Sequence, residues 1–214
     1  EEELPASQVE SARQRARAFI SKEASEHALA GGRAGNFRLL LSEEAPSERN
    51  GFRRLDWPRA VQIAVYMATH CADLGRTKLN KAMFYADFSC FAESSCSMSG
   101  LMYARATRGP IIDQYDTVFG QMVREGHLVE ESVSYGPIDA TVFKPNEDFD
   151  PSLFTESELQ ILERVVLFVN GFATAKELSE YSHKERLWVE NDNGDALSYM
   201  GAFELNDLNR FIEV

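Results

Sequence analysis

The segment of residues 77–91 constrains the fold most, because its apolar side chains recur on more than one face of the helix that it predicts. One apolar set keeps the helical spacing and consists of Leu79, Ala82, Met83, Ala86 and Cys90. A second stripe consists of Phe84, Phe88 and Phe91. The remaining face holds Lys78, Lys81 and Tyr85. A helix that is apolar on most sides is buried among other elements. We therefore predict that it forms the centre of the fold, with Leu79, Met83, Phe84 and Phe88 in the core.

Further helices are predicted on either side of this segment. Asp56-Trp57-Pro58 opens one of them, with Asp56 as the N-cap and Pro58 in the first turn, where its missing N–H costs nothing. Three later helix starts carry the S/T-x-x-E capping box: Thr155 with Glu158, Thr174 with Glu177, and Ser182 with Glu185. In each box the hydroxyl caps a backbone N–H and the glutamate reaches back to the cap residue.

One short strand is predicted between these helices. Residues 101–107 alternate in strand fashion and place Tyr103 and Arg105 on the same face. Gly109-Pro110 is expected to end this strand and to lead into an amphipathic helix over residues 111–125.

A β-hairpin is predicted after the helix of residues 111–125. Residues 128–144 flank the turn sequence Gly136-Pro137-Ile138-Asp139, and Gly126 suits the C′ position of the preceding helix. The expected fold class is α+β, predominantly α-helical, with a small antiparallel sheet built from the strand and the hairpin. Strand, helix and hairpin in this order also outline a winged helix.

The charge of the chain is unevenly distributed. The net charge is −12, and most of the acidic residues follow residue 110. The acidic side chains of the predicted helix and hairpin are Asp113, Asp116, Glu125, Glu130, Glu131 and Asp139. A surface that neutralises phosphates needs the opposite balance, so the winged-helix-like segment is not expected to bind DNA. An acidic half suits a basic protein partner or simply keeps the protein in solution.

The first 55 residues differ in composition from the rest. Residues 7–30 are rich in Ala, Arg and Glu and predict a helix, whereas residues 43–51 are expected to form an exposed linker. We therefore divide the chain into an N-terminal helical segment and linker, residues 1–55, and a main domain, residues 56–214. The first residue is Glu1, so we expect the chain to start inside a longer product or after processing. Nothing approaches the ~20 apolar residues of a membrane span, and no membrane contact is expected.

The sequence offers little chemistry of its own. It has no Gly-rich phosphate loop, no H-E-x-x-H and no C-x-x-C. Cys90 and Cys96, with Cys71 and His70, form an irregular set, so no metal and no cofactor are expected. An odd number of cysteines suits a reducing cytosol. His183 follows Ser182, but neighbours on a helix seldom face each other, which disfavours a nucleophile–base pair.

Three stretches form a recognisable set. The first motif, residues 77–88, is T-K-L-N-K-A-M-F-Y-A-D-F; the second, residues 101–110, is L-M-Y-A-R-A-T-R-G-P; the third, residues 177–188, is E-L-S-E-Y-S-H-K-E-R-L-W. In this order and at these separations they resemble the Panacea domain, the SocA-like antitoxin domain of bacterial toxin–antitoxin pairs. The family pattern is a K-L-N-K-L-x-x-Y-A-D helix, a strand ending in G-P, and an S-H-x-x-x-x-W helix. The resemblance covers roughly residues 55–203.

This resemblance implies an antitoxin that binds a cognate toxin protein and suppresses it by direct contact, without catalysis, in the bacterial cytoplasm. Three alternatives stay open: an adaptor that delivers the toxin to an ATP-dependent protease, a DNA-binding transcriptional regulator, and a small hydrolase around His183. One subgroup of the family carries a helix-turn-helix module before the domain. DNA contact is therefore expected only through such a module, of which residues 1–30 would be the tail or the connection. The toxin's identity and the oligomeric state are left open.

The predicted toxin-contact residues surround the Gly109-Pro110 turn and are Tyr103, Arg105, Arg108 and Tyr115. Tyr and Arg are enriched at interfaces because they combine large contact area with directional hydrogen bonds. The alternative interpretation is a solvated sheet face with an ordinary core tyrosine. His183 and Trp188 are five residues apart, on different sides of an ideal helix, and are each expected to pack internally.

Overall fold

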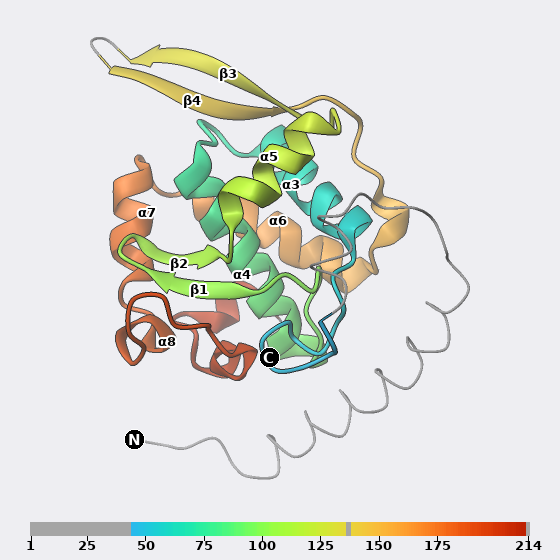
Figure 1. The fold of residues 1–214 in the computed structure, drawn as a ribbon, viewed down its shortest axis with the longest axis vertical. Coiled ribbons are helices and arrows are strands. Elements are labelled where there is room, and N and C mark those ends of the chain that lie inside the picture. The colour runs from blue at the N-terminus through green and yellow to red at the C-terminus, as the bar shows by residue number, and fades with distance from the viewer. Residues whose placement is uncertain (1–43, 136–137, 213–214) are drawn as a thin grey trace.

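A computed structural model describes residues 44–135 and 138–212, and Figure 1 shows their arrangement. The α-helices are α3 (Trp57–His70), α4 (Arg76–Ser94), α5 (Tyr115–Arg124), α6 (Glu156–Asn170), α7 (Ala175–Ser182) and α8 (Arg186–Val189). The strands are β1 (Tyr103–Ala106), β2 (Gly109–Ile112), β3 (Leu128–Tyr135) and β4 (Ile138–Pro145). Short 3₁₀ helices are η2 (Pro151–Leu153), η3 (Tyr199–Glu204) and η4 (Leu208–Arg210). The predicted class, α+β with helices dominant, is confirmed.

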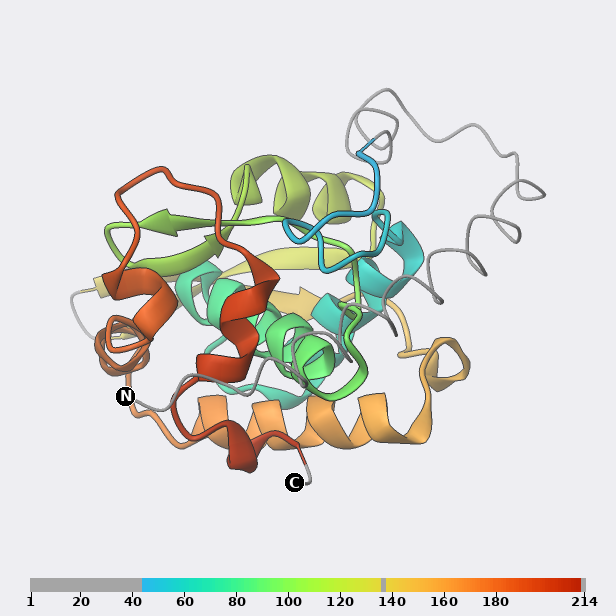
Figure 2. The same ribbon diagram turned by 90° about the horizontal axis from the view of Figure 1, so that it is seen from below.

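Helix α4 is the centre of the fold, as its apolar pattern predicts. Every residue from Lys78 to Phe91 is buried, and the predicted core residues Leu79, Met83, Phe84 and Phe88 are all fully buried. Helix α6 runs along one side of α4, and β1, β2 and α5 lie on the opposite side (Figure 2). The face outside the two apolar sets is buried as well, because Lys78, Lys81 and Tyr85 are at most 4% exposed.

The strands form two separate sheets instead of the single predicted one. β1 pairs with β2 in an antiparallel hairpin whose register sets Ala106 opposite Gly109, so Thr107 and Arg108 form the turn. Gly109-Pro110 thus starts a second strand and does not lead directly into a helix. Side chains of α4 account for the difference: Ile112 N donates to Asn80 Oδ1 at 3.0 Å, which holds β2 against the helix.

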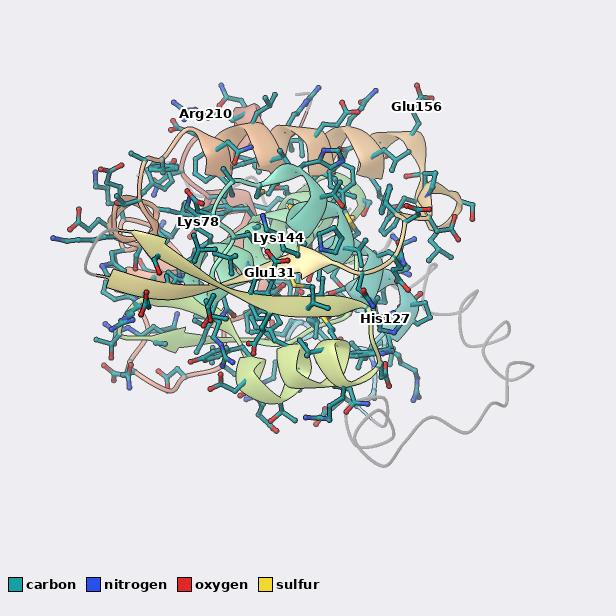
Figure 3. All side chains as sticks on the ribbon, turned by 90° about the horizontal axis from the view of Figure 1, so that it is seen from above. Lys78, His127, Glu131, Lys144, Glu156 and Arg210 are labelled. Atoms are coloured by element: carbon teal, nitrogen blue, oxygen red, sulfur yellow. The ribbon has the colours of Figure 1, made fainter. Side chains whose placement is uncertain are left out.

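The hairpin at residues 128–144 is confirmed. β3 and β4 pair with Leu128 opposite Pro145, and Figure 3 shows them crossing the molecule between α5 and α6, with Glu131 and Lys144 labelled. Gly126 ends α5 as predicted, with φ +81° and its N–H bonded to Val123 O at 3.0 Å.

Two of the three predicted capping boxes begin helices. Thr155 and Glu158 make both reciprocal bonds at the start of α6, and the Thr174 hydroxyl caps α7 through the Glu177 N–H. The third prediction was wrong, because Ser182 is the last residue of α7 and its hydroxyl donates back to Ser179 O at 2.7 Å. A serine hydroxyl can satisfy a carbonyl of its own helix as well as cap the next one.

The predicted exposed linker, residues 43–51, is exposed at Glu44, Ala45, Glu48 and Arg49, but its end packs against the core. Asn50 and Gly51 are buried, the Ser97 hydroxyl donates to Asn50 O at 2.7 Å, and the Phe52 ring stacks on Phe91 with centroids 6.1 Å apart. The predicted helix over residues 7–30 lies outside the described residues. The domain boundary after residue 55 stays a prediction.

Candidate functional site

The three sequence motifs meet at the β1–β2 turn. From the first motif, Lys81 Nζ donates to Pro110 O at 2.6 Å. From the third motif, the Ser179 hydroxyl donates to Arg108 O at 2.7 Å. The second motif supplies the turn itself. Side chains of two helices that are far apart in sequence therefore fix the backbone that presents Arg108 to solvent.

Gly109 is required where these elements touch. Its φ of +95° lies in the left-handed region that disfavours other residues. A Cβ at this position would lie 2.2 Å from Ser182 Oγ and 2.6 Å from Lys81 Nζ. The glycine of the second motif is thus the residue that lets the first and third motifs approach the turn.

His183 and Trp188 stack on each other, contrary to the prediction that they lie on different sides of one helix. Their ring centroids are 4.3 Å apart with an interplanar angle of 14°. The prediction failed because the helix is broken: α7 ends at Ser182 and α8 begins at Arg186. Burial lowers the pKa of His183, and the nearby Lys81 charge lowers it further.

Trp188 ties the third motif to β1. Its Nε1 donates to Ala106 O at 2.8 Å, and the Arg105 guanidinium lies 4.3 Å from the indole ring. Arg105 Nε also donates to Trp188 O at 3.3 Å. Such a cation–π contact contributes about 0.5–2 kcal/mol, so half-buried Arg105 has a structural role in addition to its predicted one as a contact.

Of the other predicted contact residues, two line one depression of the surface. Exposed Arg108 and half-buried Tyr115 meet in a cleft of about 350 Å³, together with Asn80 and Lys81 from α4. We call it the Lys81 cleft. A second depression of about 430 Å³ shares Thr77 and Arg108 with it and reaches His183 and α7.

Tyr103 does not agree with its prediction as a contact residue, because only 1% of it is exposed. Its hydroxyl donates to Asp87 Oδ2 at 2.8 Å. Ser99 adds two more donors to Asp87, its N–H to Oδ1 at 2.7 Å and its hydroxyl to Oδ2 at 2.5 Å. Tyr103 and Arg105 share a face of β1, but only the first residue of the strand, Tyr103, is buried in the core. Arg105, two residues further on, reaches past it to Trp188.

The burial of Lys81 is the feature of this site that the sequence pattern did not indicate. Its side chain is fully buried, and burial lowers its pKa to about 7. Among the described residues its one hydrogen-bond acceptor is Pro110 O, and no ion pair to it is formed. Lysines are seldom fully buried without a charged partner, so the spacing that placed Lys81 outside the two apolar sets of the helix did not reveal its burial.

A buried carboxyl group completes the contact between the first and third motifs. Tyr85 OH donates to Glu185 Oε1 at 2.9 Å, and Asn206 N donates to Glu185 Oε2 at 2.9 Å. Burial raises the pKa of Glu185 to about 7. The motif tyrosine therefore has a structural partner on the break between α7 and α8.

The acidic charge on the winged-helix-like segment is partly paired. Arg76 of α4 pairs with Asp116 of α5 and with Glu130 of β3. Glu125 accepts a hydrogen bond from Trp57 Nε1 at 2.8 Å. Absence of DNA binding by this segment stays a prediction.

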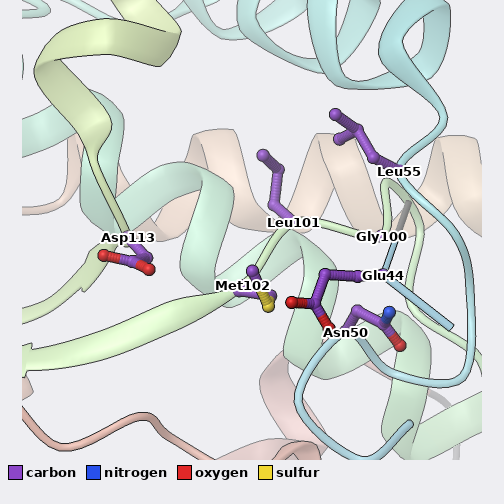
Figure 4. A pocket seen from close by; sticks show the side chains of 7 residues that line it. All are labelled: Glu44, Asn50, Leu55, Gly100, Leu101, Met102 and Asp113. Atoms are coloured by element: carbon purple, nitrogen blue, oxygen red, sulfur yellow. The ribbon is translucent and has the colours of Figure 1, made fainter. Parts of the chain in front are cut away.

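Other features of the described residues offer less. The thiols of Cys71, Cys90 and Cys96 are free and buried, and no three His, Cys, Asp or Glu side chains within the described parts could hold a metal ion. A cavity beside residues Asn50 and Leu101 has a volume of only about 10 Å³ (Figure 4), close to the lower limit for one water molecule. None of the helices in the described ranges has the length and apolar character needed to cross a bilayer.

Comparison with known families confirms the resemblance that the three motifs indicate. The family described as antitoxin SocA-like, Panacea domain matches residues 79–189, more than half of the chain. The chain belongs to this family. No curated protein and no solved structure was found to match it. The matched range contains Lys81, the β1–β2 turn and the His183–Trp188 stack.

Proposed function

We propose that this protein is an antitoxin that neutralises a cognate bacterial toxin in the cytoplasm by direct binding. The family membership supports an antitoxin role in general. The single observation that carries the finer proposal is the convergence of all three motifs on the β1–β2 turn. Because residues of all three motifs hold this one surface turn in place, we infer that the turn itself contacts the toxin.

The proposed toxin-binding face is the rim of the Lys81 cleft, with Arg108 and Tyr115 as direct contacts and Arg105 at its edge. Arg108 is exposed and held on a backbone fixed from two sides, which lowers the entropy lost on binding. Tyr103 is withdrawn from this face because its side chain belongs to the core.

The proposed mechanism is steric and electrostatic masking, without turnover of a substrate. A pure binder must hold its target for longer than the toxin needs to act, so we expect nanomolar affinity, about −12 kcal/mol. Binding needs neither metal nor nucleotide in this proposal.

The test is growth of bacteria that express the toxic product of the gene beside this one, with and without this protein. If bacteria that express the toxin grow only when this protein is also present, the proposal is supported, and co-purification of the two proteins supports direct binding. If bacteria that express both proteins do not grow, the proposal is contradicted. Toxin that disappears only when an ATP-dependent protease is present would identify the adaptor instead.

A matched variant separates binding from catalysis. His183→Ala removes the imidazole that lines the depression beside the Lys81 cleft, while leaving Trp188 bonded to Ala106 O. A folded His183→Ala protein should still protect. Loss of protection in that folded variant would favour the hydrolase alternative.

A further inference from the structure

Two positive side chains line the Lys81 cleft without an acidic partner. Within residues 44–135 and 138–212, Lys81 Nζ hydrogen-bonds only to the carbonyl of Pro110, and the Arg108 guanidinium makes no hydrogen bond or ion pair. The neighbouring cations differ in this respect. Arg76 pairs with two carboxylates, and exposed Lys176 lies 3.7 Å from Glu180.

An amine buried without a counter-charge is costly to protonate, and Lys81, although fully buried, lines the floor of an open cleft. The cost would fall if a negative group entered the cleft. The protein as a whole carries a net charge of −12, so an uncompensated positive pair is contrary to its general charge and needs a local explanation.

Arg76 and Thr77, in the first turn of α4, line the same cleft. Thr77 lines both the Lys81 cleft and the adjoining depression. The helix has 19 residues, its N-cap is Gly75 without a side-chain cap, and its first turn holds no acidic residue. Backbone N–H groups at such an end are unsatisfied and favour an anion.

We propose that the Lys81 cleft binds an oxyanion, a carboxylate or a phosphate, between Arg108, Lys81 and the first turn of α4. Its volume of about 350 Å³, with about 430 Å³ in the adjoining depression, suits an anionic side chain or a small ligand. The anion comes either from an acidic residue of the toxin or from a free phosphorylated compound. Only the first source rests on the proposed function.

The site is tested by titrating the ¹⁵N-labelled protein with sodium sulfate and with sodium acetate, using sodium chloride at matched ionic strength as the reference. Sulfate stands for a phosphate and acetate for a carboxylate. We expect saturable amide shifts at Thr77, Lys78 and Gly109. Arg108→Ala should weaken binding about tenfold, as expected for the loss of one charge-assisted hydrogen bond.

The matched control is Arg124→Ala, which removes an exposed arginine of α5 outside the cleft and should leave the anion affinity unchanged. Arg108 is exposed, so its variant is expected to fold even if a Lys81→Met protein does not. Shifts that never saturate, or equal affinities in Arg108→Ala and Arg124→Ala, would overturn the proposal.

The source of the anion is identified with the toxin complex. If a toxin carboxylate fills the cleft, sulfate no longer shifts these amides in the complex, and it competes with toxin binding. If the ligand is a free phosphorylated compound, sulfate binds the complex as well as the free protein. A failure of toxin binding leaves the titration of the free protein intact, so failure of the antitoxin proposal and failure of the anion site are separate results.

Discussion

Asp87 and Lys81 lie on the same helix, and both are fully buried, yet their surroundings differ in kind. Asp87 accepts three hydrogen bonds, two from Ser99 and one from the Tyr103 hydroxyl. Lys81 donates one, to a carbonyl, and lies at a cleft. Burial raises the pKa of Asp87 while these hydrogen bonds oppose the shift, whereas burial lowers that of Lys81 to about 7 without a comparable compensation.

The difference separates structural from binding roles within one motif. A buried charge with all its partners in place holds a particular arrangement of the core. A buried charge that is only partly satisfied, beside an opening, is available to a group from outside. The Asp87 end of α4 therefore stabilises the fold, and the Lys81 end is the part that we assign to recognition.

The largest change in stability is expected at the Asp87 end of α4. Phe84→Ala should lower the free energy of unfolding by about 3–5 kcal/mol, because the fully buried ring packs against Phe88 and Tyr103. Urea denaturation measures this value. An unchanged midpoint would mean that α4 does not face the core as described.

Asp87→Asn should cost less, about 1–3 kcal/mol, because an NH₂ group in place of Oδ2 no longer accepts from the hydroxyls of Tyr103 and Ser99 while the shape is kept. The same denaturation experiment applies. Tyr103→Phe in the Asp87→Asn background should then add little, since the two groups share one hydrogen bond. Fully additive losses would contradict the shared network.

A pH effect should be traceable to Glu185. Its pKa rises from 4.5 to about 7 on folding, so the folded state holds the proton more tightly. The resulting stabilisation is full below pH 4.5 and is lost as the pH rises through 7. Glu185→Gln cannot titrate and should remove this part of the decline in melting temperature between pH 5 and pH 8. Identical pH profiles for the two proteins would show that Glu185 is ionised throughout.

The smallest effect on stability is expected at the binding end. Lys81→Met replaces a buried amine that has no ion-pair partner with an apolar chain of similar length, so the desolvation cost that is removed offsets the lost hydrogen bond to Pro110 O. We expect a melting temperature equal to or above that of the wild type, together with weaker toxin binding. A strongly destabilised Lys81→Met protein would place Lys81 with Asp87 as a structural residue and would remove the contrast between them.

The sequence predicted what depends on local spacing. The buried helix of residues 77–91, the caps at Thr155 and Thr174, and the hairpin of residues 128–144 all follow from periodicity and turn chemistry. These features are set by residues close together in the chain, and each has a characteristic pattern.

Features that depend on distant contacts were not predictable. β2 begins at Gly109-Pro110, a dipeptide that usually marks a turn, and its position depends on Asn80 and Lys81. The His183–Trp188 stack depends on a helix break that the S-H pattern does not reveal. Three of the four predicted contact residues, Arg105, Arg108 and Tyr115, are exposed or half-buried. Tyr103 is buried, and the sequence does not reveal which face of β1 packs on the core.

The most direct test of the central claim, that the turn presenting Arg108 binds the toxin, is calorimetric titration of the toxin into Arg108→Glu and into Arg124→Glu. Both substitutions reverse one exposed arginine and should change stability by no more than about 0.5 kcal/mol. We expect Arg108→Glu to weaken toxin binding by roughly 100-fold or more, the loss typical of an interface hot spot, while Arg124→Glu binds as the wild type does. Wild-type affinity in a folded Arg108→Glu protein would show that this turn does not bind the toxin.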